Sequence, residues 1–355
     1  MPANIRVLVV DDSALIRQML TRALSLDPRI EVVGSARTGV EAVEKARVLE
    51  PDVITLDIQM PEMSGLEALP FIVRSTRARV IMLSSLDDPD VTYQALERGA
   101  VDFITKPTAG VATSLTELTD LLLKKIRTAH RVDPSKRMAA SRARQETGGA
   151  SRVVTEQAAP TKAKAMVVVA ASTGGPPALE AVFSGLGSDL PCAFLVVQHL
   201  PAGFTGSLAR RLSSVTDLDV REAEEGMQVR AGGVYVAPHG AHMSLAAGSS
   251  VVPRISLQDG PLIHGVKPSA DPLFKSTAEI FGSRSVGVIL TGMGSDGAEG
   301  LGILRKAGAE TIVQDEQTSV VWGMPGAAIK RRAAKRVMPL KLIAPEIRRA
   351  LQRMV

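Results

Sequence analysis

Several features are scarce in this sequence of 355 residues, and each scarcity narrows the range of functions. Cys192 is the only cysteine, which excludes an internal disulfide and any zinc site built from several cysteines. Aromatic residues make up 3%, which argues against a surface that stacks nucleic-acid bases. No apolar run approaches the ~18 residues of a membrane span, and Ile5–Val10 is too short for a secretory signal. We therefore expect a cytoplasmic protein.

The excess positive charge is concentrated in one segment. The net charge is +5, and residues 131–164 alone hold eight basic and three acidic side chains, so the rest of the chain balances. This segment is rich in Arg, Ala, Ser, Gly and Gln and has no sustained apolar period. We interpret it as a flexible basic linker. Because the excess lies in a linker, it gives no reason to expect a nucleic-acid partner.

A strand followed by a sharp turn opens the longest remaining segment. The run Met166–Ala171 is rich in Val, which is typical of a buried strand in a parallel sheet. Residues 172–175, Ser-Thr-Gly-Gly, then turn the chain, and the prolines that follow suit the first turn of a helix. Ser172 is therefore expected at the carboxyl end of a strand, where open α/β sheets place ligands. It could be a helix cap, part of a phosphate-holding turn, or a nucleophile beside oxyanion donors.

Residues 1–130 alternate apolar runs with helical patterns, which predicts a doubly wound parallel sheet of five β/α units. The predicted strands are Ile5–Val10, Ile30–Ala36, Val53–Asp57, Val80–Ser84 and Asp102–Thr105. The predicted helices lie near Ala14–Leu26, Gly39–Leu49, Gly65–Arg74, Val91–Arg98 and Leu115–Arg127.

Polar residues follow four of these five strands and so fall on one edge of the predicted sheet. Asp11 and Asp12 follow the first strand, Asp57 ends the third, Ser84 ends the fourth, and Lys106 comes just after the fifth. Three clustered carboxylates repel one another unless a cation joins them, and their oxygen atoms suit Mg²⁺. An aspartate beside Mg²⁺ and a lysine is a good phosphoryl acceptor, because both neutralise the charge that builds up during transfer.

The segments V-D-D-S, L-D-I-Q-M-P-E-M-S-G, M-L-S-S and D-F-I-T-K-P together resemble the receiver domain of bacterial response regulators. The resemblance implies a flavodoxin-like fold with strand order 2-1-3-4-5 and a histidine kinase as phosphodonor. It also implies the following roles: phosphorylation at Asp57, Mg²⁺ held by Asp11, Asp12 and Asp57, phosphoryl contacts from Ser84 and Lys106, and a switch aromatic at Phe103.

Residues 165–355 predict a second α/β domain with a mostly parallel sheet. The segment is longer than the small helical DNA-binding unit of a transcription factor. Strand-like runs recur at Met166–Ala171, Ala193–Gln198, Gly233–Ala237, Val286–Thr291 and Thr311–Val313.

Three polar residues could converge at the carboxyl edge of this second sheet. Ser172 and His199 follow two predicted strands, and Asp296 lies in the Gly-rich turn after a third. Serine, histidine and aspartate brought together meet the requirement of a hydrolytic triad. The order Ser…His…Asp and the lack of a G-x-S-x-G elbow make the usual α/β-hydrolase fold an unsuitable template.

Taken singly, these residues also have ordinary structural interpretations. His199 could be a satisfied core histidine, and Asp296 a turn aspartate. His239 and His242 are three residues apart, but no H-E-x-x-H pattern or nearby acid supports a metal site. We expect His239, which follows another strand end, to line the cleft.

The segments A-S-T-G-G-P, V-V-Q-H-L-P, Y-V-A-P-H, L-T-G-M-G-S-D-G and V-W-G-M-P-G-A-A look like the catalytic domain of the CheB-type chemotaxis protein-glutamate methylesterases. Together with the receiver, the resemblance spans the chain except the linker 131–164 and the extreme C-terminus. It implies a Rossmann-like domain with no cofactor of its own. It also implies these roles: Ser172 as nucleophile, His199 as base, Asp296 as its partner, and Thr173 and the Met293 backbone N–H as oxyanion donors.

The resemblance implies a phosphorylation-activated hydrolase that demethylates glutamate methyl esters, and deamidates glutamines, on the cytoplasmic helices of chemoreceptors. We expect this protein to be a monomer that associates with the membrane only through the chemoreceptors on which it acts. Two rival hypotheses remain. One is a regulator that acts by binding alone, with a vestigial triad. The other is a nucleotide-binding output domain, which the absence of a Walker lysine after Gly175 disfavours.

Overall fold

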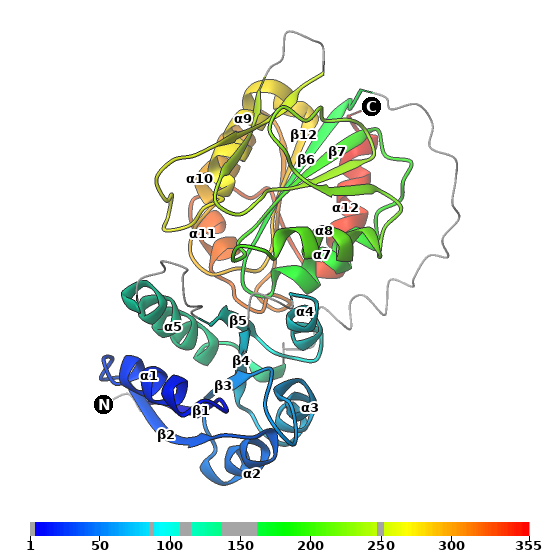
Figure 1. Ribbon diagram of the computed structural model, residues 1–355. Coiled ribbons are helices and arrows are strands. Elements are labelled where there is room, and N and C mark those ends of the chain that lie inside the picture. The colour runs from blue at the N-terminus through cyan, green and yellow to red at the C-terminus, as the bar shows by residue number, and fades with distance from the viewer. Residues whose placement is uncertain (1–3, 85–88, 107–114, 136–161, 247–251, 355) are drawn as a thin grey trace. The chain divides into compact units, whose positions relative to one another are not determined.

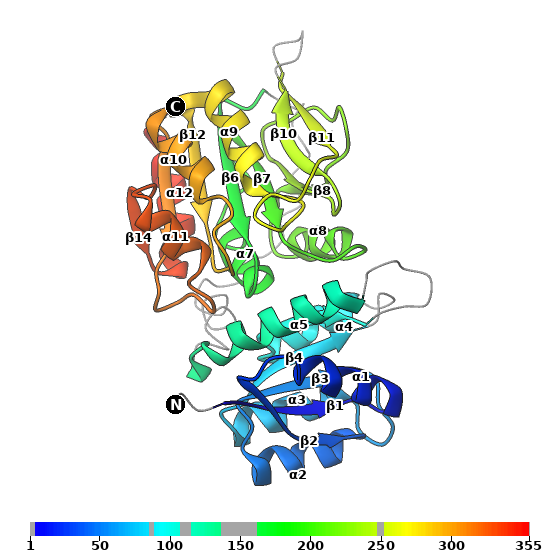
Figure 2. The same cartoon turned by 90° about the vertical axis from the view of Figure 1, so that its left-hand side faces the viewer.

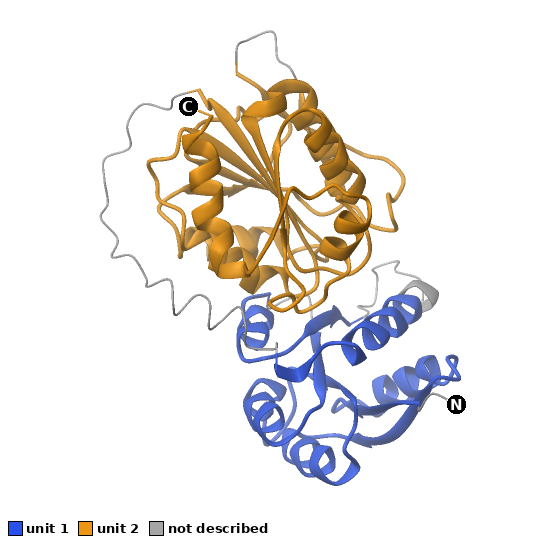
Figure 3. Ribbon diagram, turned by 180° about the vertical axis from the view of Figure 1, so that it is seen from behind, with its two compact units in different colours: residues 1–138 blue, residues 139–355 orange. Residues whose placement is uncertain are grey.

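The computed structural model of the chain describes residues 4–84, 89–106, 115–135, 162–246 and 252–354. Two compact units emerge, residues 1–138 and residues 139–355 (Figure 3). Among the described residues, no helix combines the length and the apolar character that crossing a membrane requires. Most of the predicted linker, residues 136–161, lies outside the described residues.

The first unit is a five-stranded parallel sheet in the order β2-β1-β3-β4-β5, as the resemblance to receivers implied. Its strands are β1 (Ile5–Val10), β2 (Ile30–Ala36), β3 (Val53–Asp57), β4 (Arg79–Ser84) and β5 (Asp102–Thr105). Its helices are α1 (Ala14–Leu24), α2 (Gly39–Leu49), α3 (Gly65–Ser75), α4 (Pro89–Glu97) and α5 (Leu115–His130). Helices α1 and α5 cover one face of the sheet, and α2, α3 and α4 cover the other (Figure 1).

Local sequence signals set where the helices of the first unit begin. The side chains of Ser13, Thr38 and Ser64 each accept a hydrogen bond from the backbone of the helix that follows. Ser64 forms a reciprocal capping box with Glu67. Strand β3 is buried along its whole length, which agrees with its mostly apolar sequence V-I-T-L before the final aspartate. Asp57 and Ser84 end the buried strands β3 and β4, so these polar side chains stand at the carboxyl edge of the sheet.

The second unit is built on a seven-stranded sheet in the order β14-β13-β12-β6-β7-β9-β8, in which all paired strands run parallel. A separate two-stranded antiparallel hairpin, β10–β11, packs through β10 against α9. The strands are β6 (Ala165–Ala171), β7 (Cys192–Gln198), β8 (Asp219–Glu222), β9 (Gly233–Val236), β10 (His242–Ala246), β11 (Arg254–Gln258), β12 (Ser285–Ile289), β13 (Glu310–Gln314) and β14 (Arg336–Met338). The helices are α7 (Gly175–Phe183), α8 (Thr205–Ser213), α9 (Ala270–Phe281), α10 (Ala298–Lys306), α11 (Met324–Lys330) and α12 (Leu340–Gln352), with a 3-10 turn at Gly282–Arg284.

Both faces of this sheet are covered, as expected for a Rossmann-like, doubly wound domain. Helices α9, α10 and α11 lie on one face, and α7, α8 and α12 lie on the other (Figures 1 and 2). The chain leaves β6 toward β7 on one side, whereas β12 pairs with β6 on the other side. The point between β6 and β12 is therefore the topological switch point of the sheet, the place where open α/β sheets bind ligands.

The two ends of the segment predicted as a linker make contacts within the described residues. Val132 is buried in the first unit, and its carbonyl accepts a hydrogen bond of 2.8 Å from Arg79 Nε. Ala163 is buried in the second unit, and Lys164 N–H donates to the Pro191 carbonyl at 2.9 Å. The contacts of Ala163 and Lys164 fix the entry into β6, the strand that Ser172 follows.

Candidate active site and phosphoacceptor site

Ser172 follows β6 directly, and three backbone contacts hold it in place. Its N–H donates to the Thr291 carbonyl at 3.0 Å, and its own carbonyl accepts from Gly175 N–H at 2.7 Å and from Gln198 Nε2 at 3.0 Å. The turn requires Gly174, whose φ of +75° lies in the left-handed region. The Ser172 side chain is half-buried and lies just before the N-terminus of α7. The predicted strand–turn–helix is therefore confirmed.

His199 and Asp296 form a direct pair. His199 Nε2 lies 2.8 Å from Asp296 Oδ2, and the two side chains are 11% and 2% exposed. In the sheet, Ala171 is the register partner of Gln198, so Ser172 and His199 each follow matched positions of adjacent strands. Adjacent strands lie about 4.8 Å apart. Ser172, His199 and Asp296 therefore meet at one edge, and Nδ1 is the imidazole nitrogen left for a nucleophile.

The Asp296 carboxylate is surrounded by donors. Oδ1 accepts from the Ser269 hydroxyl at 2.5 Å, and Oδ2 accepts from Ala270 N–H at 2.8 Å as well as from His199. Burial alone would raise the pKa of Asp296, but His199 and these hydrogen bonds outweigh it and hold the pKa below its usual value. Asp296 is therefore an ionised group able to orient and stabilise an imidazolium.

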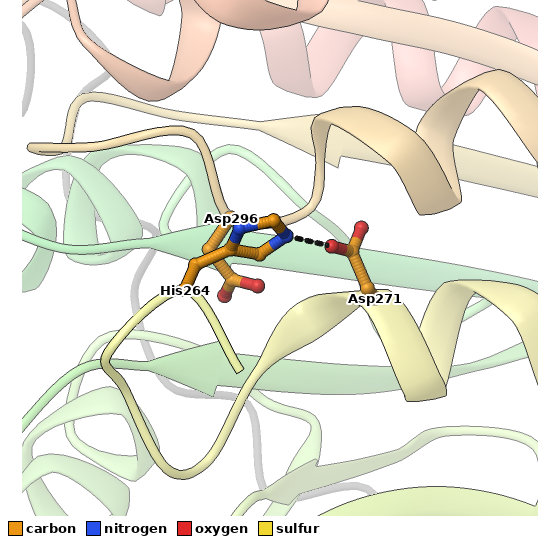
Figure 4. A group of neighbouring side chains, drawn as sticks. All are labelled: His264, Asp271 and Asp296. Atoms are coloured by element: carbon orange, nitrogen blue, oxygen red, sulfur yellow. Dashed lines mark hydrogen bonds and ion pairs between the residues drawn. The ribbon is translucent and has the colours of Figure 1, made fainter. Parts of the chain in front are cut away.

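Two residues that the sequence did not single out, His264 and Asp271, also converge on Asp296 (Figure 4). The ligand atoms of the three side chains lie within 4.8 Å of one another. His264 Nε2 contacts Asp271 Oδ2 at 2.8 Å, and Asp271 Oδ1 accepts from Gly300 N–H at 2.7 Å. Burial and the nearby Asp296 charge raise the pKa of Asp271. Both carboxylates, Asp271 and Asp296, already accept hydrogen bonds from protein donors. We therefore interpret His264 and Asp271 as residues that help to hold Asp296 in place.

The other three residues expected around the cleft lie at different depths. Thr173 is buried, and its carbonyl accepts from the Thr291 hydroxyl at 3.0 Å. Met293 is half-buried in the turn after β12. His239 is exposed, and its Nδ1 lies 2.9 Å from the Leu200 carbonyl, close in sequence to His199. Their roles as oxyanion donors or cleft lining stay predictions.

The phosphoacceptor candidates of the first unit meet at the carboxyl edge of its sheet. Lys106 Nζ lies 2.8 Å from Asp11 Oδ2 and 2.7 Å from Asp57 Oδ2, and both carboxylates are buried. Burial raises the pKa of Asp57 to about 6, against the lowering effect of Lys106. Burial lowers the pKa of Lys106, but its bonds to the two aspartates prevail and raise it. Lys106 therefore forms ion pairs with both carboxylates at once.

The donor set of this cluster fits a hard divalent cation. Asp11, Asp12 and Asp57 offer carboxylate oxygens within 4.8 Å of one another, and Asp12 is the exposed member. Oxygen-only ligation on a partly hydrated site is what Mg²⁺ prefers. The expected magnesium ligands are thus brought together around the expected phosphoacceptor.

Ser84 and Phe103, expected at the phosphoryl group and the switch, lie on β4 and β5. The Ser84 and Thr92 hydroxyls are 2.5 Å apart and buried. Phe103 is 4% exposed, and Lys125 Nζ lies 5.8 Å from the centre of its ring. A buried aromatic at this position is compatible with a switch, and that role stays a prediction.

Comparisons with known proteins agree with both units. Residues 7–115 match the model of the response regulator receiver domain, and residues 167–347 match the CheB methylesterase model. A Pyrococcus horikoshii protein named protein-glutamate methylesterase/protein-glutamine glutaminase is 44% identical over 99% of this chain and 95% of its own length. An Archaeoglobus fulgidus protein of the same name is 44% identical over 98% of each chain.

A solved structure matches the second unit. The Thermotoga maritima CheB methylesterase catalytic domain is 38% identical, with a TM-score of 0.51, over 53% of this chain and 97% of its own. Receiver and output unit together define a response regulator whose output is an α/β domain of an enzyme family. The chain belongs to the protein-glutamate methylesterase/protein-glutamine glutaminase family, the CheB type, as the sequence motifs predicted.

Proposed function

We propose that this chain is a phosphorylation-activated hydrolase that removes methyl esters from glutamates, and amide groups from glutamines, on the cytoplasmic helices of chemoreceptors. We assign residues 1–130 to the receiver, 131–164 to a tether and 165–355 to the catalytic domain. The observation that carries the proposal is the 2.8 Å contact between His199 and Asp296 at a sheet edge that also presents Ser172. Family membership supplies the substrate class.

The proposed reaction is acyl transfer through Ser172. His199 Nδ1 takes the hydroxyl proton while Oγ attacks the ester carbonyl, and Asp296 stabilises the imidazolium that forms. The tetrahedral intermediate expels methanol, which leaves with the proton from His199. Water, deprotonated by His199, then cleaves the acyl-enzyme, which releases the glutamate and restores Ser172. With a glutamine substrate, ammonia leaves in place of methanol.

The proposed regulation starts at Asp57, which takes a phosphoryl group from a histidine kinase. Asp11, Asp12 and Asp57 would hold Mg²⁺, which supplies positive charge beside the phosphoryl oxygens when bound. Lys106, now shared between two carboxylates, would turn to the new phosphoryl group. The added charge biases a two-state element, and the resulting change in the receiver releases the catalytic domain from restraint.

Methanol release from methylated receptor membranes tests the proposal. The full chain should release methanol, and a small acyl phosphate with Mg²⁺ should increase the rate. Ser172→Ala should abolish release, whereas Ser285→Ala, which removes a hydroxyl bonded to the Gly282 carbonyl, should leave it unchanged. Asp57→Asn should remove the response to the phosphodonor.

Each other outcome has a definite meaning. Methanol release by Ser172→Ala at the wild-type rate would rule out Ser172 as the nucleophile. Release that ignores the phosphodonor would keep the esterase and break its link to Asp57. No release, together with failure of a serine-reactive phosphonate to label Ser172, would favour the regulator that acts by binding alone.

A further inference from the structure

A chain of buried hydrogen bonds runs away from the triad on the far side of Asp296. Ser269 is completely buried and caps α9. Its hydroxyl bonds Asp296 Oδ1 at 2.5 Å, and its backbone N–H bonds His242 Nδ1 at 3.1 Å. His242, on β10, is 5% exposed, and its Nε2 lies 3.0 Å from the Pro261 carbonyl. One line of hydrogen bonds therefore joins the turn after β12, the start of α9, strand β10 and the loop at Pro261.

Hydrogen counting fixes the direction of every bond in this line. A backbone N–H can only donate, so His242 Nδ1 must accept, and a carbonyl can only accept, so His242 Nε2 must carry the proton. The ring is therefore the neutral Nε2–H tautomer. Ser269 has one hydroxyl proton, and the ionised Asp296 can only accept it. No member of the line can reverse its role without leaving a buried donor or acceptor unpaired.

The line decides which way the Asp296 carboxylate faces. Ser269 holds Oδ1, while Ala270 N–H, at the start of α9, holds Oδ2 beside His199. A carboxylate held by two donors on one helix start cannot rotate about χ2. His199 then presents Nε2–H to a fixed oxygen and keeps the Nδ1 lone pair toward the nucleophile.

We propose that Ser269 and His242 are positioning residues for the Ser172–His199–Asp296 triad: His242 holds the backbone of Ser269, and Ser269 holds the carboxylate that orients His199. This inference rests on the proposed triad. Neither residue touches the ester, so their effect falls on the rate of acyl transfer and not on substrate binding.

The test measures methanol release by the full chain and, separately, the rate at which a fluorophosphonate labels Ser172. Ser269→Ala should lower kcat and the labelling rate about 10- to 100-fold with KM unchanged, since it removes one hydrogen bond to a charged group. Ser276→Ala is the matched control, because Ser276 lies on the same helix and bonds Leu245 N–H at 3.0 Å. It should stay within about twofold of wild type.

Two substitutions at His242 separate its two nitrogen atoms. Asparagine places an oxygen near the position of Nδ1 and can still accept from Ser269 N–H. Glutamine places its amide near Nε2 and leaves Ser269 N–H without an acceptor. We expect His242→Asn to retain most of the labelling rate and His242→Gln to lose it toward the level of Ser269→Ala. In the wild type, nitrogen NMR of labelled histidine should show His242 as the Nε2–H tautomer.

The controls separate failure of this inference from failure of the proposed function. If Ser172→Ala is inactive while Ser269→Ala and His242→Gln keep the wild-type kcat, the triad stands and the positioning role is overturned. If Ser172→Ala remains active, the proposed function itself falls. If His242→Asn and His242→Gln lose the same activity at equal thermal stability, His242 does not act through Nδ1 and its part of the inference is overturned.

Discussion

Asp271 and Asp296 cap two neighbouring helices reciprocally: Asp296 caps α9, which contains Asp271, and Asp271 caps α10, which follows Asp296. Asp296, just before α10, accepts from Ala270 N–H at the start of α9 at 2.8 Å. Asp271, in the first turn of α9, accepts from Gly300 N–H in the first turn of α10 at 2.7 Å. Helix starts favour negative charge, and the exchange ties the two helices together at the point where the triad aspartate leaves β12. The Asp296 carboxylate is thus held by the start of α9, which Asp271 in turn ties to α10.

This exchange predicts that Asp296→Asn will be far more damaging than its small change in volume suggests. Both carboxylate oxygens face donors, so the asparagine amide must place an N–H₂ against Ser269 on one side or Ala270 and His199 on the other. We expect the rate of methanol release to fall about 10³- to 10⁴-fold, as for the wrong imidazole tautomer in a hydrolytic triad. Phosphonate labelling of Ser172 should slow in parallel. A loss of only a few fold would contradict the role of Asp296.

Gly292 packs against Ser172, the proposed nucleophile, so we expect a substitution at Gly292 to impair activity. A Cβ added there would clash with Met324 Sδ and would lie 2.8 Å from Ser172 Cβ and 3.0 Å from Ser172 N, which are atoms of a packed turn. Gly292→Ala should therefore displace Ser172, lower the rate of acyl transfer by about 10- to 100-fold and destabilise the fold by about 1–3 kcal/mol.

Gly302, in the middle of α10, provides the matched control. A Cβ there would meet only Ala333 Cβ at 3.8 Å, an ordinary contact. Gly302→Ala should leave methanol release unchanged and stabilise the chain by about 0.5–1 kcal/mol, since alanine loses less conformational freedom in a helix. Equal activity of the two variants would show that Ser172 tolerates movement.

The convergence of Ser172, His199 and Asp296 was predictable because parallel strands end at one edge, and long Val-rich runs mark those strands plainly. The strands β8, β10, β11 and β14 were not predicted. Strand β14 has three residues, all but one of them exposed, and β8 is a half-exposed edge strand, so neither carries an apolar run. The alternating hairpin β10–β11 lies outside the main sheet.

The partners of Asp296 were missed for a different reason. Ser269 and Asp271 belong to a helix start, and a serine two residues before an aspartate signals only a cap. That this cap also holds Asp296, 27 residues later in the turn after β12, depends on how α9 packs, which no local pattern reports. His264 lies in an irregular loop with no periodicity to mark it. Polar residues at predicted strand ends can be recognised in a sequence, because they share one edge of the sheet. Residues that a helix start brings to the same site cannot be recognised in this way.

Cys192 predicts a chemical property of the native chain. It begins β7, is completely buried, and burial raises the pKa of its thiol to about 12. The thiol therefore fills the core of the second unit. At pH 8 only about one thiol in 10⁴ would be ionised, and alkylation requires the thiolate. Iodoacetamide should leave the native chain unmodified and add one label in denaturant, as intact mass would show. Rapid labelling of the native chain would mean that the start of β7 opens readily.

Asp27 predicts a stability that depends on pH. It is 4% exposed, accepts a hydrogen bond from Arg29 Nε at 2.9 Å and forms an ion pair with Arg127 of α5, whose Nε lies 2.9 Å from Asp27 Oδ2. Hydrogen bonding to Arg29 lowers the pKa of Asp27 to about 2 despite burial. Because the folded pKa lies below the ordinary value of 3.8, this stabilisation is complete above pH ~4 and is lost as the pH falls toward 2. Asp27→Asn should therefore lower the free energy of unfolding of the first unit by about 1–2 kcal/mol at pH 7, a value reduced for the exposure of Arg29.

Asp219 offers a matched control for that measurement, because it pairs with Arg221 at the same two-residue spacing but both side chains are about half-exposed. Asp219→Asn should change the free energy of unfolding by less than about 0.5 kcal/mol at pH 7. Urea unfolding of both variants at pH 7, repeated at descending pH, gives the comparison. The difference between wild type and Asp27→Asn should shrink between pH 4 and pH 2, since protonation of Asp27 removes the charge that its two arginines bind. A difference that stays constant over that range would show that Asp27 acts through its shape and not through its ionisation.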